Sequence, residues 1–163
     1  MSQRPTSGSL RERAMHRILV LHGPNLNALG AREPNLYGTM PLDVLEQRLH
    51  GLAQELGCAL ETMQSNHEGV LIDSLHGAVG RADGVLLNPG GLTHTSVALR
   101  DAVLAIRIPV VEVHVTNPEG REPFRHGSYV SAAALGVIQG FGAESYLLGL
   151  RALAGYLRSG AQA

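Results

Sequence analysis

Short apolar runs alternate with longer segments of helical spacing along most of this chain, and this alternation limits the folds open to it. The clearest runs are rich in Ile, Leu and Val and cover 17–21, 84–87 and 109–115. Two weaker runs cover 59–64 and 136–139. Alternating strands and helices with short connections are typical of a parallel sheet with helices on both faces. We therefore predict an α/β fold built on a doubly wound, five-stranded parallel sheet.

The segments between and after these runs predict helices. Leucines recur at three- and four-residue intervals through 41–56, which is the spacing of one helix face. The other predicted helices cover 68–81, 96–106 and 145–158. Residues 1–16 are polar, and we expect them to form a disordered or loosely attached tail. A single domain then covers 17–160, which is long enough for one continuous core.

The chain contains no lysine, so each of its 13 basic side chains is an arginine. Catalysis through a Schiff base needs a lysine amine and is therefore excluded. A Walker A phosphate loop is excluded for the same reason. Any carbonyl chemistry in this protein must therefore use acid–base and electrostatic catalysis.

Charge and cysteine content narrow the partners and the compartment. A formal net charge of −1 gives no general attraction to nucleic acid or to anionic membranes, so neither is an expected partner. The single Cys58 rules out an intrachain disulfide and fits a reducing compartment. The sequence has no apolar run of signal-peptide or transmembrane length, so we expect a cytoplasmic protein.

Each predicted strand is followed by a loop with many polar side chains. These loops cover 23–38, 64–69, 88–96 and 112–128. The carboxyl ends of parallel strands lie on one edge of the sheet, and open α/β folds bind ligands there. Segments that are far apart in the sequence are therefore expected to meet at a single site.

The first and fourth loops contain the residues with the clearest chemistry. Arg32 and Tyr37 are five residues apart, and a guanidinium close to a phenol favours the phenolate, which is a base. Strand alternation places Glu112, His114 and Thr116 on one side of the fourth strand. An acidic neighbour can orient a histidine ring and support its protonated form, so the pair suits an acid.

A base, an acid and an anion-binding group together fit one kind of reaction. Arg125 and the backbone amides of Val115 and Thr116 suit a carboxylate, because arginine offers a planar fork of donors. This set fits proton abstraction next to a carbonyl followed by elimination. The sequence has no metal-binding motif or cofactor loop, so we expect neither a metal nor a cofactor.

Each feature also has an ordinary structural explanation. The segment Asn88-Pro89-Gly90 could serve only a turn. A serine such as Ser96 before an apolar run commonly caps a helix. Asp101 next to Arg100 would ordinarily form a solvated ion pair of small worth. The functional interpretation depends on the convergence of these segments rather than on any one of them.

Four segments together resemble the type II dehydroquinases, the 3-dehydroquinate dehydratases of the shikimate pathway. They are GPNLNALGAREPNLYG from Gly23, QSNHEG from Gln64, LLNPGGLTHTSVALRDA from Leu86 and PVVEVHVTNPEGREPFRHGSYVS from Pro109. They occur in the family's order and the resemblance covers residues 17 to about 155. It implies a flavodoxin-like fold, a cytoplasmic hydro-lyase without a cofactor, and 3-dehydroquinate as the substrate.

The resemblance also implies a role for individual residues. Tyr37 matches the base that removes the proton beside the ketone, and Arg32 matches the residue that activates this tyrosine and stabilises the transition state. Asn25 matches the residue that steadies the enolate through a water. His114 matches the acid that protonates the departing hydroxyl, with Glu112 supporting it. The residues that match substrate-binding positions are Asn88, His94, Asp101, Val115, Thr116 and Arg125.

The position of Asp101 implies an oligomer. It matches a residue that the family supplies to the site of a neighbouring subunit. The resemblance therefore implies trimers, which commonly assemble into a dodecamer.

Two other functions are weighed against this one. A flavodoxin-like module that binds a nucleotide or a flavin predicts a phosphate-binding loop after the first strand, and Gly23-Pro24-Asn25 lacks the G-x-G-x-x-G pattern. A metal hydrolase could use His94, Glu112 and His114, but these residues form no compact motif such as H-E-x-x-H. Loss of activity with a chelator would favour the hydrolase.

Overall fold

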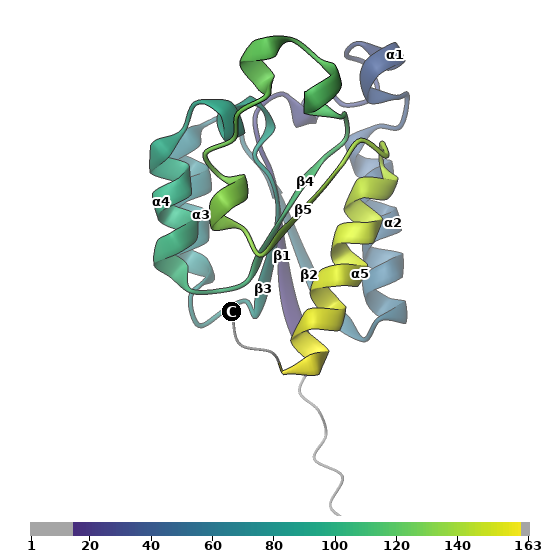
Figure 1. The fold of residues 1–163 in the computed structure, drawn as a ribbon. Helices are drawn as coiled ribbons and strands as arrows, with labels where there is room; N and C mark the ends of the chain where they lie inside the picture. The colour runs from purple at the N-terminus through teal and green to yellow at the C-terminus, as the bar shows by residue number, and fades with distance from the viewer. Residues whose placement is uncertain (1–14, 161–163) are drawn as a thin grey trace, which may run out of the picture.

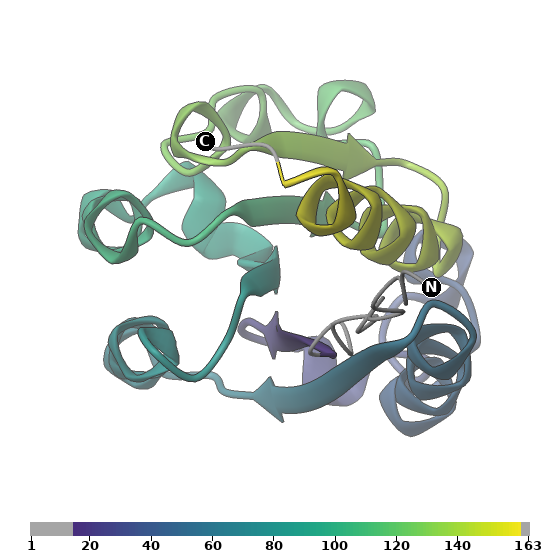
Figure 2. The ribbon, with the colours of Figure 1, turned by 90° about the horizontal axis from the view of Figure 1, so that it is seen from below.

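The computed structural model describes residues 15–160 and confirms the predicted parallel sheet. Figure 1 labels the strands, and Figure 2 shows them side by side in the order β2-β1-β3-β4-β5. Their bounds are β1 His16–His22, β2 Cys58–Gln64, β3 Gly84–Asn88, β4 Val110–His114 and β5 Gly136–Gln139. The predicted tail lies outside the described residues except for Met15 and His16, and His16 is the first residue of β1.

Helices cover both faces of the sheet, as the doubly wound prediction requires. Figure 2 shows α2 and α5 on one face and α3 and α4 on the other. The bounds are α1 Pro34–Tyr37, α2 Leu42–Glu55, α3 Glu68–Ala78, α4 Val97–Ile106 and α5 Glu144–Ser159. Helix α3 ends three residues earlier than predicted, because the backbone turns at Val79 and Gly80 takes a positive φ of 77°. The single turn α1 was not predicted.

The strand side chains alternate between two cores, one on each face of the sheet. In β1, Ile18 and Val20 pack on the side of α2 and α5, whereas Leu19 and Leu21 pack on the side of α3 and α4. Each such side chain, once buried, contributes on the order of 2 kcal/mol through the hydrophobic effect. The central strands are apolar on both faces, which is typical of a parallel sheet.

Two glycines allow close contacts that position the strand ends. A Cβ on Gly149 would lie 2.7 Å from Val113 Cγ1, so its absence lets α5 pack directly on β4. A Cβ on Gly23 would lie 2.7 Å from the Pro89 carbonyl, so its absence brings the loops after β1 and β3 together. The Gly23 amide also donates to the Asn88 carbonyl at 2.7 Å. These contacts fix the loops that follow β1 and β3 against each other.

A buried polar cluster joins β1, β3 and α5 at the carboxyl ends of β1 and β3. His22 Nδ1 lies 2.9 Å from Tyr146 Oη, and both side chains are fully buried. A side-chain hydrogen bond also joins Tyr146 to Asn88. His22 Nε2 lies 3.3 Å from Glu46 Oε1 without hydrogen-bond geometry. Burial lowers the pKa of His22 to about 4, so the ring is neutral at neutral pH.

The low pKa of His22 predicts a loss of stability in acid. Between its unfolded pKa of 6.5 and its folded pKa of about 4, only the unfolded chain binds this proton. The free energy of unfolding then falls as the pH is lowered, by about 3 kcal/mol at pH 4. We expect His22→Asn to remove this part of the slope, measured by urea unfolding at pH 7 and pH 4. Parallel slopes in both proteins would contradict the assignment.

Candidate active site

A polar pocket lies at the carboxyl edge of the sheet, between the loops that follow β1, β3 and β4. It encloses about 140 Å³. Of the predicted site residues, those that line it are Asn25, Arg32, Tyr37, Asn88, His94, His114, Val115, Thr116 and Arg125. A larger cavity of about 530 Å³ lies between β2 and α3 and contains none of them. Three of the four strand-end loops, those after β1, β3 and β4, therefore converge as predicted, whereas no residue of 64–69 lines the pocket.

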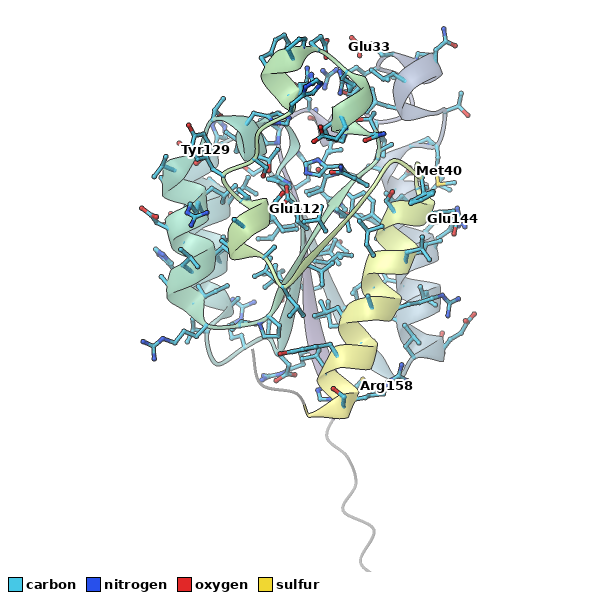
Figure 3. All side chains as sticks on the ribbon, viewed as in Figure 1. Glu33, Met40, Glu112, Tyr129, Glu144 and Arg158 are labelled. Carbon is cyan, nitrogen blue, oxygen red and sulfur yellow. The ribbon has the colours of Figure 1, made fainter. Side chains whose placement is uncertain are left out.

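Tyr37 is held between two arginines in this pocket. Tyr37 is the last residue of α1, the short helix that begins after Glu33, and Glu33 is labelled at the top of Figure 3. Arg32 Cζ lies 5.0 Å from the centre of the Tyr37 ring, as the spacing predicted. Arg121 Nη1 donates a hydrogen bond to Tyr37 Oη at 2.8 Å, and its Cζ lies 5.3 Å from the ring centre. Two guanidinium groups therefore contact one phenol.

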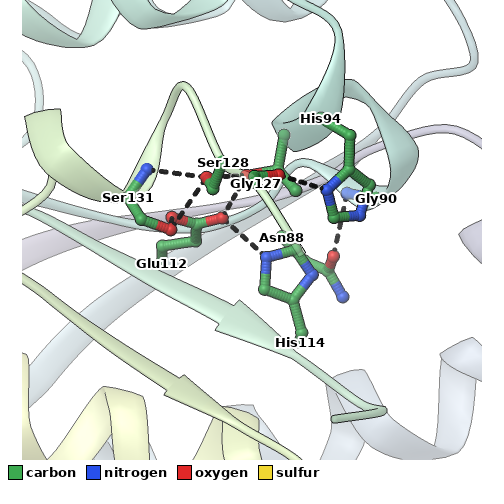
Figure 4. Close-up of polar contacts among 9 residues, drawn as sticks. Asn88, Gly90, His94, Glu112, His114, Gly127, Ser128 and Ser131 are labelled. Carbon is green, nitrogen blue, oxygen red and sulfur yellow. Dashed lines mark hydrogen bonds and ion pairs between the residues drawn. The ribbon is translucent and has the colours of Figure 1, made fainter. Parts of the chain in front are cut away.

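His114 is paired with a fully buried carboxylate. His114 Nε2 lies 2.6 Å from Glu112 Oε1, and Figure 4 shows the two side chains facing each other across the end of β4. His114 is 8% exposed and Glu112 is 0% exposed. This geometry supports the predicted pairing, because the carboxylate orients the ring and balances the charge of an imidazolium. His114 lines the pocket and Glu112 does not.

Hydroxyl groups supply the remaining hydrogen bonds of Glu112. Thr93 Oγ1 donates to Glu112 Oε1 at 2.5 Å, and Ser131 Oγ donates to Oε2 at 2.7 Å. Burial by itself raises the pKa of Glu112. The hydrogen bonds from His114, Thr93 and Ser131 outweigh burial, so the pKa lies below its ordinary value. Glu112 is therefore a carboxylate at neutral pH.

Asn25 has an unusual backbone conformation that a second loop supports. Its φ is 70° and its ψ is −3°, in the left-handed region, which asparagine tolerates better than most residues. The backbone amide of Asn25 donates to Asn66 Oδ1 at 2.9 Å, and Gln64 Nε2 donates to the same oxygen at 3.0 Å. The segment after β2 thus helps to hold Asn25 at the mouth of the pocket.

The predicted substrate-binding side chains already have partners inside the protein. Asn88 Oδ1 accepts the Gly90 amide at 3.0 Å, which fixes the orientation of the Asn88 side chain. His94 Nδ1 lies 2.6 Å from the Gly127 carbonyl oxygen, as Figure 4 shows. Arg125 Nε lies 2.8 Å from Glu122 Oε2. A bound carboxylate would therefore share Arg125 with Glu122 or displace it.

Asp101 lies apart from these residues. It is exposed on α4 and does not line the pocket of its own chain. The solvated pair with Arg100 is not observed either, because Arg100 Nη1 donates to the Tyr129 carbonyl at 2.9 Å. The single chain gives Asp101 no contact with its own pocket.

Arg121 is the main site residue that the sequence did not single out. Its side chain is 11% exposed and reaches both Tyr37 Oη and Thr116 Oγ1, the latter at 3.4 Å. Arg121 and Tyr37 are 84 residues apart, and no short motif joins them. A useful signal was present, because Arg121 follows the same strand as His114 and belongs to the same polar loop.

The fold and the pocket define an α/β acid–base enzyme of the flavodoxin-like class. A phenol between two guanidinium groups faces a pocket that also contains a histidine on a buried carboxylate. Known proteins make the assignment more specific. Residues 16–154 match the sequence family Dehydroquinase class II. The chain therefore belongs to the class II dehydroquinase family.

Individual relatives agree with this family over most of the chain. The 3-dehydroquinate dehydratase of Gloeobacter violaceus is 56% identical over 146 residues, which cover 90% of this chain and 91% of the relative. Two solved structures are similar. The type II dehydroquinase of Butyrivibrio crossotus has a TM-score of 0.84 and 39% identity and covers 85% of this chain and 97% of its own. The enzyme of Propionibacterium acnes has a TM-score of 0.82 and 42% identity and covers 85% and 96%.

Proposed function

We infer that this enzyme removes water from 3-dehydroquinate to form 3-dehydroshikimate, a step of the shikimate pathway. Membership of the class II dehydroquinase family supports the reaction and the substrate. The observation that carries the proposal is the position of Tyr37, whose phenol accepts a hydrogen bond from Arg121 in the same pocket as His114. A candidate base and a candidate acid thus share one pocket, which an elimination of water requires.

We propose that Tyr37 is the base. Arg121 and Arg32 stabilise its phenolate, which takes the proton from the carbon next to the ketone. The electron pair of that C–H bond moves to the ketone oxygen and forms an enolate. Asn25, at the mouth of the pocket, is our candidate for stabilising the charge on this oxygen. Dipoles that are already fixed before the reaction stabilise the charge that develops on this oxygen, which lowers the barrier of the first step.

His114 then acts as the acid. As an imidazolium it gives a proton to the hydroxyl at the adjacent carbon, the C–O bond breaks, and water leaves while the enolate collapses to a conjugated enone. Glu112 accepts a hydrogen bond from His114 Nε2–H throughout and balances the positive charge of the ring. The neutral histidine that remains still donates Nε2–H to Glu112. The balance is one water lost for each substrate, with no electron donor or acceptor required. Before the next turnover, Tyr37 releases the proton it took and His114 regains one, by exchange with solvent.

The other pocket residues suit the rest of the substrate. We propose that Arg125, with the backbone at Val115 and Thr116, binds the carboxylate, because all three line the pocket and a guanidinium matches the planar geometry of a carboxylate. Asn88, at the end of β3, and His94, in the loop that follows, also line the pocket, and we propose that they bind hydroxyl groups of the substrate.

A direct assay tests this function. The purified protein is mixed with 3-dehydroquinate, and the ultraviolet absorbance of the conjugated enone is followed with time. We expect a rise that depends on protein concentration and persists after treatment with a chelator. No rise, with the protein folded, would refute the proposed reaction, and loss of activity with the chelator would favour a metal hydrolase.

We further propose that three chains form a trimer in which Asp101 completes the site of a neighbour, and that trimers assemble into a dodecamer. Asp101 has no place in its own pocket and is exposed on α4. Val97 and Leu104, one helical turn to either side on the same face, are each 52% exposed. An acidic residue flanked by exposed apolar side chains fits an interface that delivers a carboxylate to a second chain.

Complementation between two weakened variants tests this arrangement. Asp101→Asn and Tyr37→Phe are each expected to have low activity as pure proteins. In mixed trimers, a subunit that carries Asp101→Asn keeps Tyr37 and can receive Asp101 from a Tyr37→Phe neighbour. We therefore expect co-expression of the two variants to restore activity well above their sum. Activity equal to the sum would show that Asp101 does not act across an interface.

The protein fits a reducing compartment, and we propose the cytoplasm. The single Cys58 is a buried free thiol, and burial raises its pKa, which keeps it protonated and unreactive. Among residues 15–160, no helix is both long and apolar enough to cross a membrane.

A further inference from the structure

We propose that Thr93, Ser128 and Ser131 are positioning residues for the acid of the reaction. Their hydroxyl groups, here called the hydroxyl cluster, hold Glu112 as an oriented carboxylate, so that His114 can give its proton to the leaving hydroxyl. This inference rests on the proposed function, because it assigns a task to the Glu112–His114 pair within that reaction.

The hydroxyl cluster is compact, with Thr93 buried and with Ser128 and Ser131 partly exposed. Thr93 comes from the 3-10 helix Gly90–His94, and Ser131 begins the 3-10 helix Ser131–Ala133. Ser128 Oγ joins them, at 2.6 Å from Thr93 Oγ1 and 2.8 Å from Ser131 Oγ. Figure 4 shows Ser128 and Ser131 grouped around the carboxylate of Glu112. Thr93 is 1% exposed, so solvent does not replace its hydrogen bond.

The hydroxyl cluster favours the carboxylate form of Glu112. Thr93 donates its hydroxyl proton to Glu112 Oε1, and Ser131 donates to Oε2. Ser128 Oγ accepts the Ser131 backbone amide at 2.9 Å and lies 2.6 Å from Thr93 Oγ1, so it holds both donors in place. Hydrogen bonds from these donors stabilise the charged form, and the pKa of Glu112 lies below its ordinary value although burial alone would raise it.

The charge of Glu112 determines the state of His114. A carboxylate that only accepts requires a proton on His114 Nε2, which lies 2.6 Å away. The second ring nitrogen, Nδ1, is then free for the substrate, since His114 lines the pocket. In the imidazolium, Nδ1 carries the proton that is transferred. Transfer of the Nδ1 proton to the leaving hydroxyl therefore depends on the orientation in which Glu112 holds the His114 ring.

The surrounding charged groups do not compete for this carboxylate. Two pockets share His114 in their lining, and the charged or titratable side chains that line them besides Tyr37 and His114 are Arg32, His94, Glu119, Arg121, Arg125 and His126. Glu119 is itself acidic, and Arg32 Cζ lies 5.0 Å from the Tyr37 ring. Arg121 binds Tyr37, Arg125 pairs with Glu122, His94 contacts the Gly127 carbonyl and His126 contacts the Arg121 carbonyl. An arginine on Glu112 would neutralise its charge permanently. Neutral hydroxyl donors keep the charge, so that it remains available to balance the imidazolium.

A purely structural role would give a different pattern of effects. Donors to a buried carboxylate stabilise the fold in any protein. Such a role would lower stability and affect both steps of the reaction in proportion to the folded fraction. A positioning role acts through His114 alone, so it slows the departure of water and spares the formation of the enolate.

Thr93→Val and Ser131→Ala test the inference, because each removes one hydroxyl with little change in volume. Thr93→Ser restores a hydroxyl at the same place. Thr62→Val, on β2 and outside the pocket, is the matched control for the threonine-to-valine change. Two rates are measured on 3-dehydroquinate in D₂O: release of enone by absorbance, and exchange of deuterium at the carbon next to the ketone by NMR. Thermal unfolding confirms that each variant is folded.

We expect Thr93→Val and Ser131→Ala to lower kcat for enone release by roughly tenfold or more, the effect of losing a hydrogen bond to a charged group. Deuterium exchange should continue, because the enolate still forms and now returns to substrate. The acid limb of the kcat profile should move to higher pH, since the Glu112–His114 pair takes up its second proton more easily. Thr93→Ser should recover most of the loss, and Thr62→Val should show none.

Three outcomes would overturn the inference. They are unchanged enone release in folded Thr93→Val and Ser131→Ala, equal losses of release and exchange, and failure of Thr93→Ser to recover activity. An inactive wild-type protein would instead refute the proposed function. The assay of the wild type therefore separates the two failures.

Discussion

Replacing Tyr37 by phenylalanine is expected to reduce kcat for enone formation by a factor of about 10³, within the range of general acid–base catalysis. The ring remains and keeps its packing against Arg32 and Arg121, while the oxygen that takes the proton is lost. Deuterium exchange next to the ketone should fall by the same factor, because the enolate no longer forms. Binding of 3-dehydroquinate, measured by calorimetry, should change only a few-fold.

The control for this change is another tyrosine. Tyr156→Phe removes a hydroxyl from α5, away from the pocket, and should leave turnover unaltered. The base assignment fails if Tyr37→Phe turns over at a near-normal rate. It also fails if exchange persists while release is lost, since another group would then be removing the proton.

Arg121→Leu is expected to lower kcat by roughly a hundredfold, the effect of losing a charged hydrogen bond to the base. The change removes the donor 2.8 Å from Tyr37 Oη and leaves the phenolate with Arg32 as its nearby cation. Arg121→Lys should recover only part of the activity, because a shorter point charge cannot hold both Tyr37 Oη and Thr116 Oγ1. Enone release and deuterium exchange should fall together.

A double-variant cycle shows whether Arg121 acts through the phenol. In a protein that already carries Tyr37→Phe, Arg121→Leu should cause little further loss of kcat, since the group that it assists is gone. Arg32→Leu should behave in the same way. Additive losses would mean that Arg121 contacts the substrate itself, and Tyr37 would then have only one supporting arginine.

The sequence predicted the framework because burial on both faces leaves a clear pattern. Runs such as Ile18-Leu19-Val20-Leu21 face a core on each side, so every position is apolar. The leucines of 41–56 marked the buried face of α2 just as clearly. The turn α1 escaped prediction because Pro34–Tyr37 is too short to show a helical period.

The site was predictable only where the key residues are neighbours in the chain. Arg32 with Tyr37, and Glu112 with His114, fall within one loop or one strand, so their spacing indicated their contact. Arg121 reaches Tyr37 across 84 residues, after the turn Pro118–Gly120 redirects the chain. No local pattern reports such a contact.

The remaining hydrogen-bond partners at the site are of residue types that give no distinctive sequence signal. Thr93, Ser128 and Ser131 are residues that turns and helix caps commonly use, so nothing in the sequence distinguished them. Tyr146 contacts His22 across 124 residues, a separation that no local pattern reports. The task proposed for Asp101 needs a second chain, which one sequence cannot supply by periodicity or spacing.

The position of Glu112 has a consequence for how the molecule is completed. A carboxylate at the centre of β4 is costly to bury until its donors arrive, and these come from two separate segments, 90–94 and 131–133. Both oxygens of Glu112 are therefore paired with hydroxyl groups only when both segments are in place. Folding of two segments that are distant in sequence and orientation of the proposed acid thus depend on the same buried carboxylate.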